Sequence, residues 1–177
     1  IPSLAFPFLF AFFYCIWNGL KSENKNKRAV FSAASAVCFA ALVFSYFYVW
    51  TTAAAVLFAL TLFVLIFRTE NWRSDFLFLF TTGAFCVLSL VPYAVLLSNR
   101  NQTMDKAQLL VLTRRPDLLQ KVEIIGYFVL TFTALALFLK ITRLAEKKVY
   151  LIAAMAAAPL IVFNQQVLTG RSLQPFH

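Results

Sequence analysis

Two long stretches of this chain contain no charged residue. Residues 29–67 and 76–98 are free of Asp, Glu, Lys and Arg. A helix needs about 20 predominantly apolar residues to cross the hydrocarbon core of a bilayer. The first stretch, of 39 residues, is long enough for two crossings, and the second is long enough for one. These stretches predict an integral membrane protein.

The composition indicates which kind of membrane fold to expect. Hydrophobic residues make up 62% of the 177 residues and charged residues 13%, whereas a soluble domain has about 25% charged residues. Backbone amides cannot stay unpaired in lipid, and the apolar runs are unbroken rather than alternating, which favours helices over barrel strands. We therefore predict an all-α, polytopic transmembrane helical bundle that forms one domain over residues 1–177. Because the chain begins with Ile, we expect it to be part of a longer one.

The sequence predicts about six spans. The charge-free stretch at residues 29–67 is divided near residues 48–52, where Tyr46, Tyr48 and Trp50 form an aromatic belt of the type found at headgroup level. Pro92 is expected to kink the fourth span. The predicted spans cover about residues 4–17, the two halves of 29–67, 76–97, 123–139 and 149–163.

The basic residues predict the orientation of this bundle. With six spans, three short connections share one face and hold ten basic residues: Lys21, Lys25, Lys27, Arg28, Arg68, Arg73, Lys140, Arg143, Lys147 and Lys148. The other face has six, spread over a longer loop and the tail. By the positive-inside rule the first face is cytoplasmic. The net charge of +9 then reflects topology and anionic headgroups, and no nucleic-acid partner is predicted.

The long extracytoplasmic loop, residues 99–121, is the first candidate site. It contains both leucines and charged residues, a mixture that suits one or two short interfacial helices. Arg114 and Arg115 precede Pro116, and their guanidinium groups could pair bidentately with a phosphate. Alternatively, both arginines extend to lipid headgroups as ordinary interfacial residues.

The polar tail is the second candidate site. Asn164 and Gln165 follow an apolar helix, and Arg171 comes shortly after them. Side-chain amides suit sugar hydroxyls because each amide both donates and accepts hydrogen bonds. The alternative is that these residues cap the last helix. We expect His177 to have no catalytic role, and the cysteines Cys15, Cys38 and Cys86 to be free thiols.

Four segments carry a resemblance to a known family. They are "SYFYVWTTAAA" (residues 45–55), "VPYAVLLSNR", "VLTRRPDLL" and "VFNQQVLTGRSLQPFH" (residues 162–177). They resemble the C-terminal half of large bacterial membrane proteins that are similar to C-type glycosyltransferases, which use polyprenyl-phosphate-linked sugars outside the cytoplasm. The resemblance implies that this chain shapes the lipid-carrier and sugar groove. The catalytic acid of such transferases lies in an early loop that has no match here, because Asp105 and Asp117 are in the wrong part of the chain.

The sequence thus leaves the activity open. The first hypothesis is a relative of lipid-linked-sugar transferases with Arg114, Arg115, Asn164, Gln165 and Arg171 as contacts. The second is a non-catalytic subunit of a larger membrane complex, such as a respiratory or photosynthetic assembly, that packs against partner subunits and lipid. A transporter is disfavoured because no predicted span has an ionisable residue in its middle. No cofactor and no metal site are predicted, because no His, Cys or carboxylate cluster is present.

Overall fold

A computed structural model describes residues 4–45, 47–68, 71–99, 121–139, 141 and 146–164. Six α-helices account for nearly all of these residues, and the described part of the chain contains no strand. The helices are α1 (Ala5–Lys21), α2 (Lys25–Ser45), α3 (Phe47–Phe67), α4 (Trp72–Ser98), α6 (Lys121–Phe138) and α7 (Lys147–Asn164). The all-α prediction is confirmed.

Three of these helices are long and apolar enough to cross a membrane. They cover Lys25–Ser45, Val49–Phe67 and Trp72–Leu96. At a rise of about 1.5 Å per residue, a helix of 21 residues extends for about 30 Å, which matches the hydrocarbon core. Ala5–Lys21 and Ile124–Phe138 are apolar but shorter.

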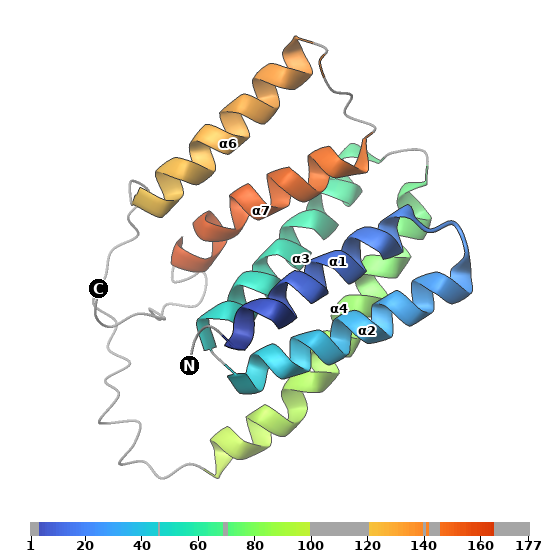
Figure 1. Cartoon of the computed structure of the whole chain (residues 1–177), viewed down its shortest axis with the longest axis vertical. Helices are drawn as coiled ribbons and strands as arrows, with labels where there is room; N and C mark the ends of the chain where they lie inside the picture. The colour runs from blue at the N-terminus through green and yellow to red at the C-terminus, as the bar shows by residue number, and fades with distance from the viewer. Residues whose placement is uncertain are drawn as a thin grey trace.

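The helices run alternately up and down the bundle (Figure 1). α1 packs on α2, α2 packs on α4, and α3 packs on α7. α6 packs chiefly on α7 and lies at the edge of the bundle. One end of the bundle, the basic end, holds Lys21, Lys25, Arg28, Arg73 and Lys147. At the opposite end α2 and α4 finish, α3 begins and α7 finishes.

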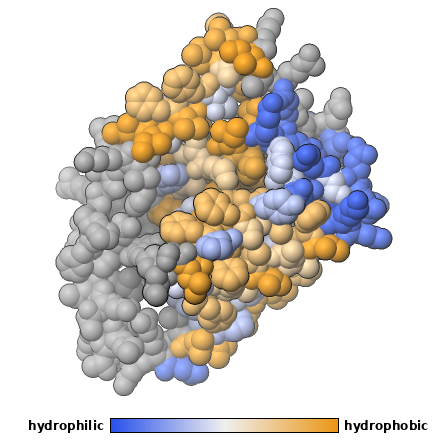
Figure 2. All heavy atoms as spheres, in the orientation of Figure 1, coloured by the Kyte–Doolittle hydropathy of each residue, from blue (hydrophilic) through white to orange (hydrophobic). Residues whose placement is uncertain are grey.

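Apolar side chains cover the flanks of this bundle as well as its core. Phe12, Leu42 and Leu60 are almost fully buried, but Phe10 is 66% exposed, Phe132 68% and Phe138 81%. Figure 2 shows hydrophobic residues over the sides of the molecule and hydrophilic ones gathered at the basic end. Large exposed apolar surfaces are rare on monomeric proteins in water. This distribution suits a bundle whose flanks contact lipid.

The predicted spans differ from the helices in their boundaries. α2 ends at Ser45 and α3 begins at Phe47, before the predicted segment 48–52, and Trp50 lies inside α3. The prediction relied on the aromatic belt. Such a belt marks a depth in the membrane rather than the end of a helix. α4 starts at Trp72, one turn earlier than predicted, and it continues through Pro92 to Ser98.

Candidate functional site

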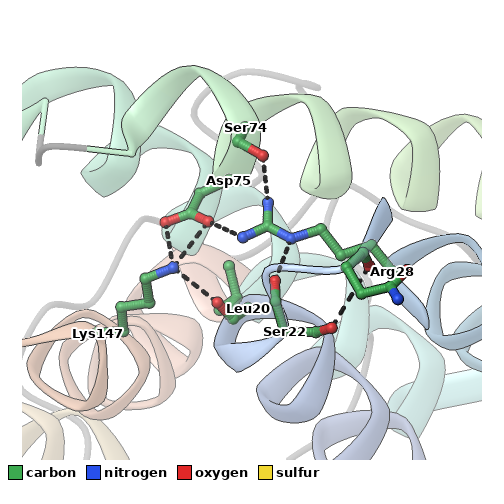
Figure 3. Close-up of polar contacts among 7 residues, drawn as sticks. Leu20, Ser22, Arg28, Ser74, Asp75 and Lys147 are labelled. Atoms are coloured by element: carbon green, nitrogen blue, oxygen red, sulfur yellow. Dashed lines mark hydrogen bonds and ion pairs between the residues drawn. The ribbon is translucent and has the colours of Figure 1, made fainter. Parts of the chain in front are cut away.

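A buried ion cluster joins three connections at the basic end (Figure 3). Its centre is Asp75, in the first turn of α4, which is only 1% exposed. Nη2 of Arg28, from the start of α2, donates to Oδ1 of Asp75 at 2.7 Å. Nζ of Lys147, from the start of α7, lies 2.9 Å from Oδ1 and 2.8 Å from Oδ2. One carboxylate therefore pairs with two cations from different helices.

Both cations also donate to groups other than Asp75. Nε of Arg28 donates to the carbonyl oxygen of Ser22 at 2.6 Å, and its Nη1 donates to Oγ of Ser74 at 2.9 Å. Nζ of Lys147 donates to the carbonyl oxygen of Leu20 at 2.6 Å, at the end of α1. The cluster thus holds the ends of α1, α2, α4 and α7 together. This geometry confirms that the three basic segments predicted to share a face do meet at one end.

The cluster is built for stability rather than for turnover. Burying a charge is costly unless the charge is paired and hydrogen-bonded, and every member here has partners within the chain. Both oxygens of Asp75 already accept hydrogen bonds, and its side chain is 2% exposed. The carboxylate is therefore closed to a substrate.

Below the cluster, α2 and α4 meet through small polar side chains. The hydroxyl of Thr82 lies 3.0 Å from that of Ser32 and donates to the carbonyl of Phe78 at 2.8 Å. The hydroxyl of Ser35 donates to the carbonyl of Phe31 at 2.8 Å. All three side chains are buried. Small polar residues let membrane helices approach closely and bond across the interface.

A groove of about 650 Å³ lies between α3 and α4, and we call it the α3–α4 groove. It extends from Thr61 and Leu79, in the half toward the basic end, past the middle of both helices to Trp50 and Leu90 in the opposite half. Its hydroxyl group, on Thr61, already donates to the carbonyl of Leu57 at 2.7 Å. The lining is otherwise almost entirely apolar: Phe39, Trp50, Ala54, Leu57, Phe58, Leu79, Phe80, Gly83, Ala84, Cys86, Val87, Leu88 and Leu90.

Gly83 leaves room in this groove. A Cβ atom built at this glycine would meet only Cδ2 of Leu57, at 3.9 Å, which is an ordinary van der Waals contact. The wall of the α3–α4 groove is therefore open at Gly83, and a larger side chain there would project into free volume.

A smaller cavity of about 270 Å³ joins this region to α7. It shares Trp50, Ala54 and Phe58 with the α3–α4 groove, and its other lining residues are Thr51 and Ala55 of α3 and Ile161 and Val162 of α7. The last turn of α7 therefore lies beside the outer part of the groove. Asn164 closes that turn.

The structure places one of the five predicted site residues. Asn164 is half-buried, and its Nδ2 donates to the carbonyl of Leu160 at 3.0 Å. This bond satisfies a carbonyl in the last turn, as the capping interpretation predicts. Arg114, Arg115, Gln165 and Arg171 lie outside the described residues, as do residues 100–120, which hold nearly all of the predicted interfacial helices. The proposed grouping of the five residues stays a prediction.

Sequence reasoning missed both the ion cluster and the α3–α4 groove. The cluster had a signal, because Asp75 directly precedes an apolar run while Arg28 and Lys147 flank others on the same predicted face. The groove had no signal in the sequence, because its lining residues are of the same apolar types as the rest of the helices. Among the described residues, no group of three His, Cys, Asp or Glu side chains is placed to hold a metal ion.

Comparison of the chain with protein-family models, with curated protein sequences and with solved structures gives no match. The geometry of the groove and of the two ends of the bundle is therefore the basis for a proposed function.

Proposed function

We propose that this chain is a multi-pass domain of a bacterial inner membrane in which all six helices cross the bilayer, with the basic end in the cytoplasm. Three helices have the length and apolarity for crossing. The exposed phenylalanines on the flanks support a lipid environment for the others. The basic residues meet at one end, which the positive-inside rule assigns to the cytoplasm.

In this orientation the α3–α4 groove holds the hydrocarbon chain of a lipid. The observation on which this proposal rests is the volume of the groove, about 650 Å³. Its described lining is almost entirely apolar and the hydroxyl of Thr61 is already bonded, so the groove suits an apolar ligand. Its outer part lies beside the end of α7, from which the polar tail continues. A lipid with its chain in the groove would carry its headgroup toward that tail.

The resemblance to C-type glycosyltransferases suggests which lipid this is. We propose a polyprenyl-phosphate-linked sugar, with its phosphate near Arg114, Arg115 or Arg171 and its sugar near Asn164 and Gln165. The chain then binds and positions the carrier, and the catalytic acid comes from residues beyond these. Support for this step comes from the apolar groove and from the position of Asn164 at its outer end.

Filling the groove tests the proposal. Gly83→Leu places an isobutyl group in the open wall, and Ala94→Leu adds bulk at an exposed position of the same helix outside the groove. Each variant, in native membranes, is irradiated with a polyprenyl phosphate that carries a diazirine in its chain. We expect Gly83→Leu to lower labelling of α3 and α4 severalfold, and Ala94→Leu to label like the parent. Equal labelling of all three proteins would contradict the proposal.

A second function, as a non-catalytic subunit, is favoured by α6. This helix packs chiefly on α7 and leaves Phe128 and Phe132 more than 60% exposed, a surface that a partner helix could cover. Purification from native membranes at low detergent separates the two functions. A stoichiometric partner that protects α6 from lipid-phase labelling favours the subunit, and labelling of the groove by the carrier favours the first proposal.

A further inference from the structure

One row of side chains on α3 borders two apolar spaces. The α3–α4 groove continues from this row onto α4, and the cavity of about 270 Å³, here called the α3–α7 cavity, continues from it onto α7. Trp50, Ala54 and Phe58 line both spaces. Residues four apart in a helix are neighbours on one face, so these three side chains follow one another along α3. The row is therefore the common wall of the groove and the cavity.

The side chain in the middle of this row is the smallest. Ala54 carries only a methyl group, and it lies between the indole of Trp50 and the phenyl ring of Phe58. The indole is held by edge-on contacts, because its ring centroid lies 6.0 Å from that of Phe39 and 6.5 Å from that of Tyr93. Phe58 is 56% exposed. Ala54 thus leaves a gap between two aromatic rings, and we call it the Ala54 gap.

The two parts of the proposed lipid belong in these two spaces. Its headgroup belongs near Asn164, and Ile161 and Val162, in the same turn of α7, line the α3–α7 cavity. Its chain belongs in the α3–α4 groove, which extends to Leu79 on α4. A chain that joins the two spaces crosses the row on α3, and the crossing with the least obstruction is at Ala54.

We propose that one polyprenyl chain passes through the Ala54 gap, with the part nearest its phosphate in the α3–α7 cavity and its far part in the α3–α4 groove. The groove and the cavity are then a single binding site. Ala54 determines its specificity, because any larger side chain at this position closes the passage between them. The inference rests on the proposed function, since it takes the ligand to be a lipid whose headgroup lies toward the end of α7.

Two forms of geranylgeranyl phosphate test the gap in native membranes. The head probe carries a diazirine next to the phosphate, and the tail probe carries it at the far end of the chain. After irradiation, mass spectrometry measures the labelling of peptides from α4 and from α7. In the parent protein we expect the head probe to label α7 and the tail probe to label α4, because the chain starts in the cavity and ends in the groove.

Substitutions in the row on α3 then close or move the gap. Ala54→Phe should lower labelling of α4 by the tail probe severalfold and leave labelling of α7 by the head probe unchanged. Ala94→Phe adds the same bulk at an exposed position of α4 outside both spaces, and it should label like the parent. Ala54→Phe/Phe58→Ala conserves the volume of the row and opens a gap one turn away, so it should restore labelling of α4. Ala54→Leu closes the gap with less bulk and gives the same comparison if Ala54→Phe does not fold.

Three results would overturn the gap and leave the proposed lipid in the α3–α4 groove. The first is unchanged labelling of α4 by the tail probe when Ala54 is replaced by Phe or Leu, because the chain would then enter the groove directly from the bilayer. The second is equal labelling of α4 by both probes in the parent, which would place the whole chain in the groove. The third is an equal loss of labelling at α4 and α7, which would mean general damage to the site. No labelling of α4 by either probe in the parent would instead overturn the proposed function together with the gap.

Discussion

The basic end of the bundle and the α3–α4 groove differ in how their helices pack. At the basic end, charged groups are taken out of water and fixed by partners, so that Asp75, Arg28 and Lys147 join several helices at one point. Between α3 and α4, an apolar groove of about 650 Å³ extends from that half of the bundle into the opposite half. The comparison shows that polar contacts join the helices at one end, whereas α3 and α4 leave an apolar groove between them along much of their length.

The largest expected effect is at the basic end. Asp75→Asn leaves the buried Arg28 and the partly buried Lys147 without a counter-charge, and removing one member of a buried ion pair costs about 3–5 kcal/mol. We expect the free energy of unfolding in micelles, measured by denaturant titration, to fall by that amount. Glu23→Gln is the control, because Glu23 is exposed at the same end and should change stability by less than about 0.5 kcal/mol. Equal stability of the two variants would mean that the cluster does not hold the helices.

A medium effect is expected where α6 meets α7. A Cβ atom at Gly126 would lie 2.6 Å from the carbonyl oxygen of Ala156, a backbone atom that cannot move aside cheaply. Gly126→Ala should therefore destabilise the protein by about 1–3 kcal/mol, as overpacking does.

The matched substitution in the groove should have the opposite sign. Gly83→Ala meets no atom closer than 3.9 Å, and replacing a helical glycine with alanine contributes about 0.5–1 kcal/mol. The same unfolding titration checks both glycines. A stabilising Gly126→Ala would show that α6 does not approach α7 as closely as described.

The smallest effect is expected at the polar contact between α2 and α4. Thr82→Val removes the bond to Ser32 at 3.0 Å, and such bonds between membrane helices average about 0.6 kcal/mol. A double-mutant cycle with Ser32→Ala measures the coupling free energy. Thr81→Val is the control, because the Thr81 hydroxyl bonds only to carbonyls of its own helix. A coupling free energy as large as the effect of Asp75→Asn would mean that this contact, rather than the ion cluster, contributes most to holding the helices together.

Features that depend on local properties of the sequence could be predicted, whereas features that depend on contacts between helices could not. The helices and the shared end of the three basic segments follow from apolar length and charge position, which are local properties of the sequence. The partners of Asp75 depend on which helices become neighbours, and the groove depends on where they do not touch. Neither can be derived from one span at a time. Asn164 is placed at the end of α7, and the other predicted contacts lie outside the described residues.

The most direct test of the account is the side of the membrane on which each end lies. Three helices, α2 to α4, separate Glu23 from Asn99, and both residues are exposed. In a background without Cys15, Cys38 and Cys86, single cysteines at Glu23 and Asn99 are treated with an impermeant maleimide in bacterial cells with an opened outer membrane. The account predicts labelling of Asn99→Cys in intact spheroplasts and of Glu23→Cys only after lysis. Labelling of both before lysis, or the reverse pattern, would contradict it.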